Sequence, residues 1–120
     1  MLVGYSGGGV VAALVAARRR DVALLIAVAA PLDPADWTRH LGLSPLEGSQ
    51  SPMDHARALS GVPLVAFAGE RDTTVPVGSI RSALGKLGPG AMTRLIVIPN
   101  FDHRCCWVRD WKRLCEMAAP

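Results

Sequence analysis

The sequence predicts an α/β protein, with a parallel sheet of about four strands flanked by helices. Short β-like apolar runs alternate with helical runs along the 120 residues, which is typical of a parallel sheet covered by helices. Residues 22–28 form a nearly continuous apolar run, as expected of a strand buried on both faces. Half of the residues are hydrophobic and 19% are charged, so the chain can bury a core.

The first expected strand, residues 2–5, leads through a tight turn into a helix over about residues 7–19, where apolar residues recur at helical spacing. The later elements continue the alternation: a strand over 22–28, a strand over 63–68, a helix over about 77–87, a strand over 94–98 and a last helix over about 104–117.

Residues 31–61 interrupt this alternation. The segment is too long for a plain connection in a compact domain, so it should have structure of its own. Asp33-Pro34-Ala35-Asp36 combines a helix cap, a proline at the first helical position and an acid in the first turn, and predicts a short helix through His40. Ser51-Pro52-Met53-Asp54 predicts a second short helix, with a loop over 42–48 between the two. The segment is expected to be either a helical lid-like excursion that walls a substrate pocket or a solvated insertion.

Charge and hydropathy exclude several classes of partner. The formal net charge is only +3, and the basic run Arg18-Arg19-Arg20 falls at the expected end of the first helix, where cations complement the helix dipole. No aromatic residues interleave with it, so no nucleic-acid partner is predicted. The longest uncharged apolar stretch, residues 22–30, is far shorter than the roughly 20 residues of a membrane span. We expect a soluble protein, cytoplasmic by default, with any targeting segment lying upstream of Met1.

Neither a metal nor an organic cofactor is predicted. Cys105 and Cys106 stand beside His103, but no C-x-x-C pair or second histidine cluster completes four ligands. The odd count of three cysteines favours reduced thiols. The glycines at 7–9 suggest a phosphate-binding loop only weakly, because no G-x-G-x-x-G or Walker lysine accompanies them.

Candidate catalytic residues follow three of the expected strands. Gly4-Tyr5-Ser6-Gly7-Gly8 fits the G-x-S-x-G pattern between a strand and a helix, where a sharp turn presents a serine hydroxyl. Asp72 lies in the loop that leaves the third strand, and His103 in the loop that leaves the fourth. Ligands of open α/β sheets bind at the carboxyl ends of the strands, so these three side chains share the expected functional edge.

These segments resemble the catalytic half of the α/β-hydrolase superfamily, in which nucleophile, acid and histidine follow in this order. The resemblance covers nearly the whole chain. It implies a truncated α/β-hydrolase fold, with residues 1–120 forming a partial hydrolase domain. It also implies that Ser6 attacks an acyl carbonyl, that His103 transfers the proton, and that Asp72 orients the imidazole. The backbone N–H of Gly7 would stabilise the oxyanion.

Each assignment has an alternative. Ser6 also fits a helix cap, and Glu70 or Asp102 also fits the acid. His40 and His55 are rivals of His103, but both fall in the expected excursion helices, where surface placement is more typical. Tyr5, Trp107 and Trp111 are interpreted as packing residues.

The resemblance also implies missing parts. A complete member of the superfamily has strands before the elbow, and a loop among them supplies a second oxyanion donor, whose loss costs roughly 10²–10³ in turnover. The elbow strand would then be an edge strand, which favours self-association. Two functions follow: a serine hydrolase acting on a small-molecule acyl substrate, or an inactive fragment that lacks half of the oxyanion hole.

Overall fold

The structure, a computed structural model, describes residues 1–44 and 50–120. The expected loop over 42–48 falls partly on residues 45–49, outside the described residues. Strands and helices follow one another in the order β1 (Leu2–Tyr5), α1 (Gly7–Arg18), β2 (Leu25–Val28), α2 (Pro34–His40), η1 (Pro52–His55, a 3-10 helix), α3 (Ala56–Ser60), β3 (Leu64–Gly69), α4 (Val77–Gly85), β4 (Thr93–Ile98) and α5 (Trp111–Ala118).

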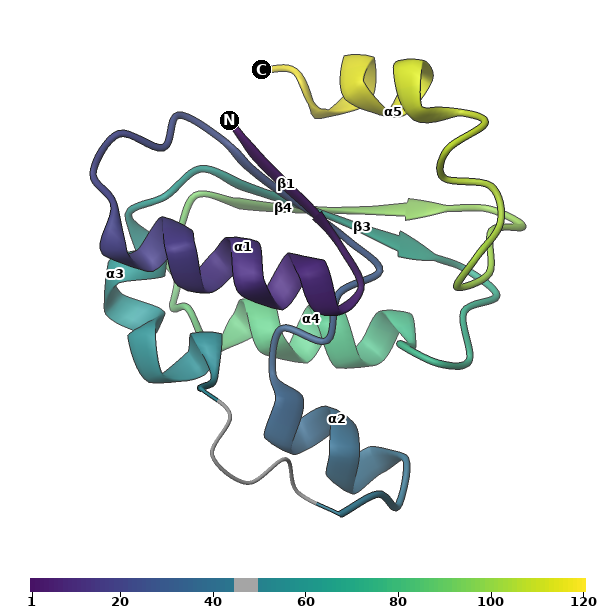
Figure 1. Cartoon of the computed structure of the whole chain (residues 1–120), viewed down its shortest axis with the longest axis horizontal. Coiled ribbons are helices and arrows are strands. Elements are labelled where there is room, and N and C mark those ends of the chain that lie inside the picture. Colours follow the sequence, from purple (N-terminus) through teal and green to yellow (C-terminus); the bar gives the residue numbers. More distant parts are fainter. Residues whose placement is uncertain (45–49) are drawn as a thin grey trace.

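The four strands form one parallel sheet in the order β1-β2-β3-β4, so the predicted fold class is confirmed. Helices α1, α3 and α4 lie on one face of the sheet and α5 lies on the other (Figure 1). Because every crossover connects parallel neighbours, the loops that follow the four strands all leave from the same end of the sheet.

The core is divided into two layers by the alternation of side chains along the strands. Leu25 and Ala27 of β2 pack with the helices α1, α3 and α4, whereas Ile26 and Val28 point to the opposite face. Phe67 on β3 is fully buried on that second face, together with Phe101, Trp107 and residues of α5. The central strands β2 and β3 are therefore buried on both faces, as their apolar runs predict.

β1 lies at one edge of the sheet, where it pairs only with β2 among the described strands. The register starts with Leu2 opposite Leu25, and β2 is shorter than the predicted strand over 22–28. Val3 and Tyr5 of this edge strand are each 44% exposed.

The last helix starts later than predicted. Residues 105–110 form turns, and α5 begins only at Trp111. The carboxylate of Asp102 accepts the backbone N–H groups of Arg104 and Cys105. These bonds stabilise a non-helical turn at the position where the first turn of the helix was predicted. The side chains of Cys105 and Cys106 lie against one another in these turns.

The interval over 31–61 contains helices close to those predicted. Asp33 caps α2 by accepting the backbone N–H of Asp36, and Ser51 forms a capping box with Asp54 at the start of η1. The second helix differs only in that its first turn is 3-10. Among the described residues, no helix has both the length and the hydrophobicity needed to cross a bilayer.

Candidate active site

Ser6 stands at a strained turn between β1 and α1. Its φ of 52° and ψ of −123° are unusual for a residue with a Cβ. Its backbone N–H donates to the Val28 carbonyl at 2.8 Å, which holds the turn against the end of β2. Gly4 allows the close return of the chain, because a Cβ there would lie 2.2 Å from the Gly8 carbonyl oxygen.

The Ser6 hydroxyl points toward His103. The distance from Ser6 Oγ to His103 Nε2 is 3.0 Å, a hydrogen bond between residues 97 positions apart. Ser6 occupies the N-cap position of α1, yet its side chain makes no capping hydrogen bond. Its hydroxyl is therefore engaged with the imidazole, as the nucleophile interpretation requires.

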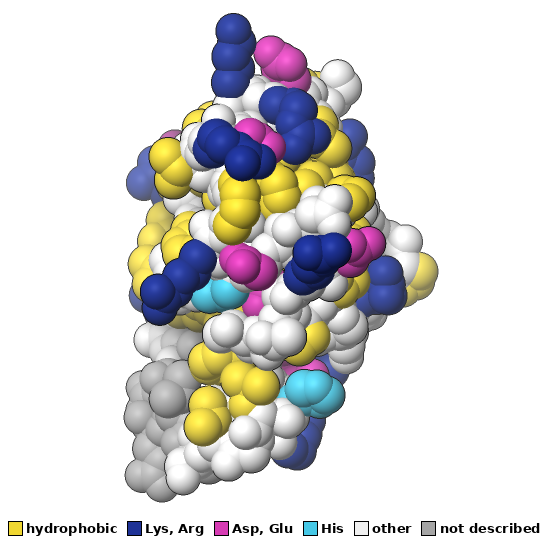
Figure 2. All heavy atoms as spheres, turned by 90° about the vertical axis from the view of Figure 1, so that its right-hand side faces the viewer, with side chains coloured by type: hydrophobic (Ala, Val, Ile, Leu, Met, Phe, Trp, Pro, Cys, Tyr) yellow, Lys and Arg dark blue, Asp and Glu magenta, His cyan; other side chains and the backbone are white. Residues whose placement is uncertain are grey.

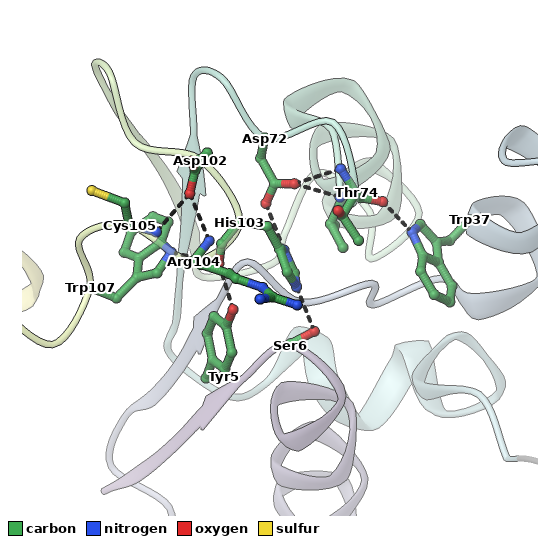
Figure 3. A network of polar contacts seen from close by, with 11 residues as sticks. Tyr5, Ser6, Trp37, Asp72, Thr74, Asp102, His103, Arg104, Cys105 and Trp107 are labelled. Atoms are coloured by element: carbon green, nitrogen blue, oxygen red, sulfur yellow. Dashed lines mark hydrogen bonds and ion pairs between the residues drawn. The ribbon is translucent and has the colours of Figure 1, made fainter.

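Asp72 lies on the other side of the imidazole. His103 Nδ1 is 2.9 Å from Asp72 Oδ2, and the Asp72 side chain is completely buried. Its second oxygen, Oδ1, accepts the backbone N–H groups of Thr74 and Val75 at 2.8 and 2.7 Å. The carboxylate is thus fixed in one orientation, and Figure 3 shows the array running from Asp72 through His103 to Ser6.

The competing acids have other partners. Glu70 accepts the backbone N–H of Asn100 at 3.2 Å. Asp102 is exposed, and its carboxylate accepts the N–H groups of Cys105 and Arg104, which together lower its pKa. The competing histidines, His40 and His55, end the helices α2 and η1, and neither appears among the hydrogen bonds of this array.

The loops that carry Asp72 and His103 are in close contact. The backbone N–H of Arg71 donates to the Phe101 carbonyl at 2.8 Å. A Cβ on Gly69 would lie only 2.6 Å from that same carbonyl oxygen. A larger residue at position 69 would therefore push the two loops apart.

Two residues that the sequence assigned to packing bind the catalytic loop. The hydroxyl of Tyr5 donates to the His103 carbonyl at 2.5 Å, and Trp107 Nε1 donates to the same oxygen at 3.1 Å. Burial, followed by the charge of Asp72, raises the pKa of Tyr5, so the phenol remains a donor at neutral pH. The only hint in the sequence was that Tyr5 precedes Ser6, because the contact spans 98 positions.

A pocket of about 490 Å³ opens beside Ser6 and Gly7. Helix α1 forms one wall, and the segment after β2 forms the other, with the lining residues Val10, Val11, Leu14, Pro31, Pro34, Trp37 and Gln50. Gly7 is the first residue of α1, so its N–H lies at the positive end of the helix dipole next to the Ser6 hydroxyl. Among the described residues, no cluster of three His, Cys, Asp or Glu side chains is arranged to hold a metal ion.

Solved structures share this arrangement of strands and helices. An α/β serine hydrolase homologue from Coxiella burnetii matches with a TM-score of 0.67 at 20% identity, over 98% of this chain and 46% of that chain. The esterase domain of a Rhodothermus marinus protein matches with a TM-score of 0.73 at 19% identity, over 97% and 57% of the two chains. The chain has the α/β-hydrolase fold.

A third structure with this fold, a thermophilic esterase from the Planctomycetes species Thermogutta terrifontis, matches with a TM-score of 0.66 at 22% identity, over 96% of this chain and 54% of that chain. The chain therefore spans about half the length of these α/β-hydrolase neighbours. No protein-family model matches the sequence, and no curated protein matches it at a significant level.

Proposed function

We propose that the chain is a serine hydrolase that cleaves an ester or a related acyl bond. The observation that carries this proposal is the hydrogen-bonded array of Ser6, His103 and buried Asp72 at the carboxyl end of the sheet. A serine hydroxyl becomes a nucleophile when a neighbouring base can take its proton and a third group orients that base.

The chemistry follows from the geometry. With its proton on Nδ1, His103 donates to Asp72 and leaves Nε2 free to accept the Ser6 proton. Ser6 Oγ then attacks the acyl carbon, and His103 returns the proton to the leaving alcohol, so that an acyl-enzyme forms. Water hydrolyses the acyl-enzyme by the same proton transfers in reverse, and the carboxylic acid is released.

The developing oxyanion needs donors, and the backbone N–H of Gly7 is the candidate that this chain supplies. It lies directly after the nucleophile, at a helix N-terminus that favours negative charge. The solved neighbours add support for an acyl substrate, because two are esterases and the one from Thermogutta terrifontis was solved with butyrate bound.

The alternative is a non-catalytic chain. It is favoured by one observation, that the chain spans about half of the length of its structural neighbours. Such a chain would have the array of Ser6 and His103 and would lack the second oxyanion donor, at a cost of roughly 10²–10³ in turnover.

A fluorophosphonate probe distinguishes the two. We expect the probe to label the folded chain on Ser6, and both Ser6→Ala and His103→Ala to abolish the labelling. Ser82→Ala, on the exposed side of α4, is the matched control and should label normally. A folded chain, verified by circular dichroism, that does not react would overturn the hydrolase proposal. Ser6-dependent turnover of short activated esters would rule out the non-catalytic alternative.

A further inference from the structure

We infer that the pocket beside Ser6 binds an uncharged, apolar acyl group, and that Trp37 is the wall that determines which acyl groups fit. The inference rests on the proposed hydrolase function and adds to it the class of substrate. It starts from the lining of the pocket, which comes from two segments that are distant in sequence, the first half of α1 and the start of the 31–61 interval.

The lining is uncharged and mostly apolar. Of the nine described residues around the pocket, none carries a charge, and only Ser6 and Gln50 have polar side chains. Ser6 and Gly7 contribute the reacting group and the start of α1, and apart from the Gln50 amide the remaining walls are aliphatic, proline or indole. A carboxylate or ammonium group in this pocket would lose its hydration without gaining a charged partner, so the lining discriminates against charged acyl chains.

Trp37 is the largest of these side chains, and it is linked to the catalytic loop. Its indole Nε1 donates to the Thr74 carbonyl at 2.7 Å. The backbone N–H of Thr74 in turn donates to Asp72 Oδ1 at 2.8 Å. Figure 3 shows this chain of contacts, from Trp37 through Thr74 to Asp72 and on to His103. The pocket wall and the acid that orients His103 are therefore linked by two hydrogen bonds through Thr74.

The other end of α2 is anchored as well. Asp33, which caps the helix, is buried and forms an ion pair with Lys86 after α4. The side chain of Thr38 in the same helix is also buried. Because α2 is held both at its cap and through Trp37, the indole is positioned as a fixed wall of the pocket rather than as a freely rotating side chain.

The first test compares two fluorophosphonate probes of equal length, one with an alkyl chain and one whose chain ends in a carboxylate. We expect the alkyl probe to label Ser6 at least about tenfold faster. Leu14→Glu places a charge in the pocket and should reduce labelling by the alkyl probe about tenfold more than it reduces labelling by a methyl-sized probe. Val15→Glu, the next residue on α1, does not line this pocket and is the matched control.

The second test uses Trp37. Trp37→Leu should shift the preference among a series of alkyl probes toward longer or bulkier chains, because the wall recedes. Trp37→Phe keeps most of the ring but removes the N–H, so it should slow labelling by all the probes several-fold with little change in their order. Trp111→Phe, on α5, should change neither.

The outcomes separate the two proposals. If no probe labels the folded chain, the proposed function fails. If the methyl-sized probe labels Ser6 but the alkyl and carboxylate probes react equally fast, the apolar pocket is wrong and the hydrolase proposal stands. An unchanged chain-length profile in Trp37→Leu would remove Trp37 as the specificity-determining wall.

Discussion

The loops at the carboxyl ends of the strands and the open edge of β1 are two neighbouring surfaces of opposite character. In the loops, Asp72 and His103 are hydrogen-bonded to one another. Two backbone N–H groups also donate to the Asp72 carboxylate, and the Tyr5 hydroxyl donates to the His103 carbonyl. Along the edge, Val3 and Tyr5 are partly exposed beside an apolar groove of about 510 Å³. That groove is also lined by Val28, Arg104, Trp107, Val108 and Trp111, and Val108 is 92% exposed.

The two surfaces differ in the kind of side chain they present: polar, hydrogen-bonded groups in the loops and apolar groups along the edge of β1. Figure 2 views the molecule from the side on which the strands end, where charged side chains cross the middle of the face and hydrophobic ones gather above and below. Among the described residues, no buried side-chain polar atom lacks a hydrogen-bond partner. The candidate site therefore needs no further polar group to hold its geometry, whereas the edge leaves apolar surface and backbone groups that a neighbouring chain could cover.

The largest effect is expected from Asp72→Asn. The asparagine oxygen can keep the two N–H donors of Thr74 and Val75, but its amide then faces His103 and favours the wrong tautomer. Turnover or labelling should fall by about 10⁴ while the melting temperature changes little. Glu70→Gln is the control and should be nearly neutral, so equal losses in both variants would contradict the assignment of the acid.

Gly69→Ala tests the contact between the two loops. Its Cβ would press against the Phe101 carbonyl at 2.6 Å, so the free energy of unfolding should drop by about 1–3 kcal/mol and activity should fall with it. Gly78→Ala in α4, where a Cβ would meet nothing within 4 Å, should stabilise the chain by up to about 1 kcal/mol. Chemical denaturation measures both, and an unaffected Gly69→Ala would refute the close approach.

Tyr5→Phe removes only the hydroxyl that donates to the His103 carbonyl. The lost hydrogen bond is worth about 0.5–1.5 kcal/mol, so we expect labelling to slow by roughly threefold to tenfold. A variant with the wild-type labelling rate would show that Trp107 alone positions this carbonyl. The result bears on both surfaces, because Tyr5 contacts the loop that carries His103 and also lines the groove beside β1.

Val3→Glu tests the edge without touching the site. If β1 mediates self-association, a charge there should lower the self-associated fraction in sedimentation experiments and leave Ser6 labelling unchanged. Val97→Glu, on the opposite edge strand β4, is the matched control. Equal effects of the two substitutions would argue against a specific role of β1.

The smallest effect concerns pH. Because the pKa of Asp102 is lowered in the folded chain, its charge contributes stability above the unfolded-state pKa and loses that contribution as the pH falls through the folded-state value. We therefore expect wild type to melt slightly above Asp102→Asn at pH 6, and the gap to close below about pH 4. A gap that persists at pH 2 would show that the difference is not electrostatic.

The alternation of elements could be read from the sequence because it depends on local patterns. The buried strands were visible as apolar runs, and α2 was visible from the cap and proline at Asp33 and Pro34. The start of α5 was not, because Asp102 diverts the backbone into turns by a side-chain contact that competes with helix formation. Local helix propensity alone could not decide between an earlier start of the last helix and the turns that follow Asp102.

By itself, the sequence determined that a serine turn, an acid and a histidine follow three strands in the order typical of hydrolases. Only the tertiary structure decided that Asp72, and not Glu70 or Asp102, faces His103, and that Ser6 binds the imidazole instead of capping its helix. It also decided that Tyr5 and Trp37 hold the site. The physical reason is range: turns and helix caps are set by neighbouring residues, whereas these contacts join residues 31 to 98 positions apart, which the register of the parallel strands brings together.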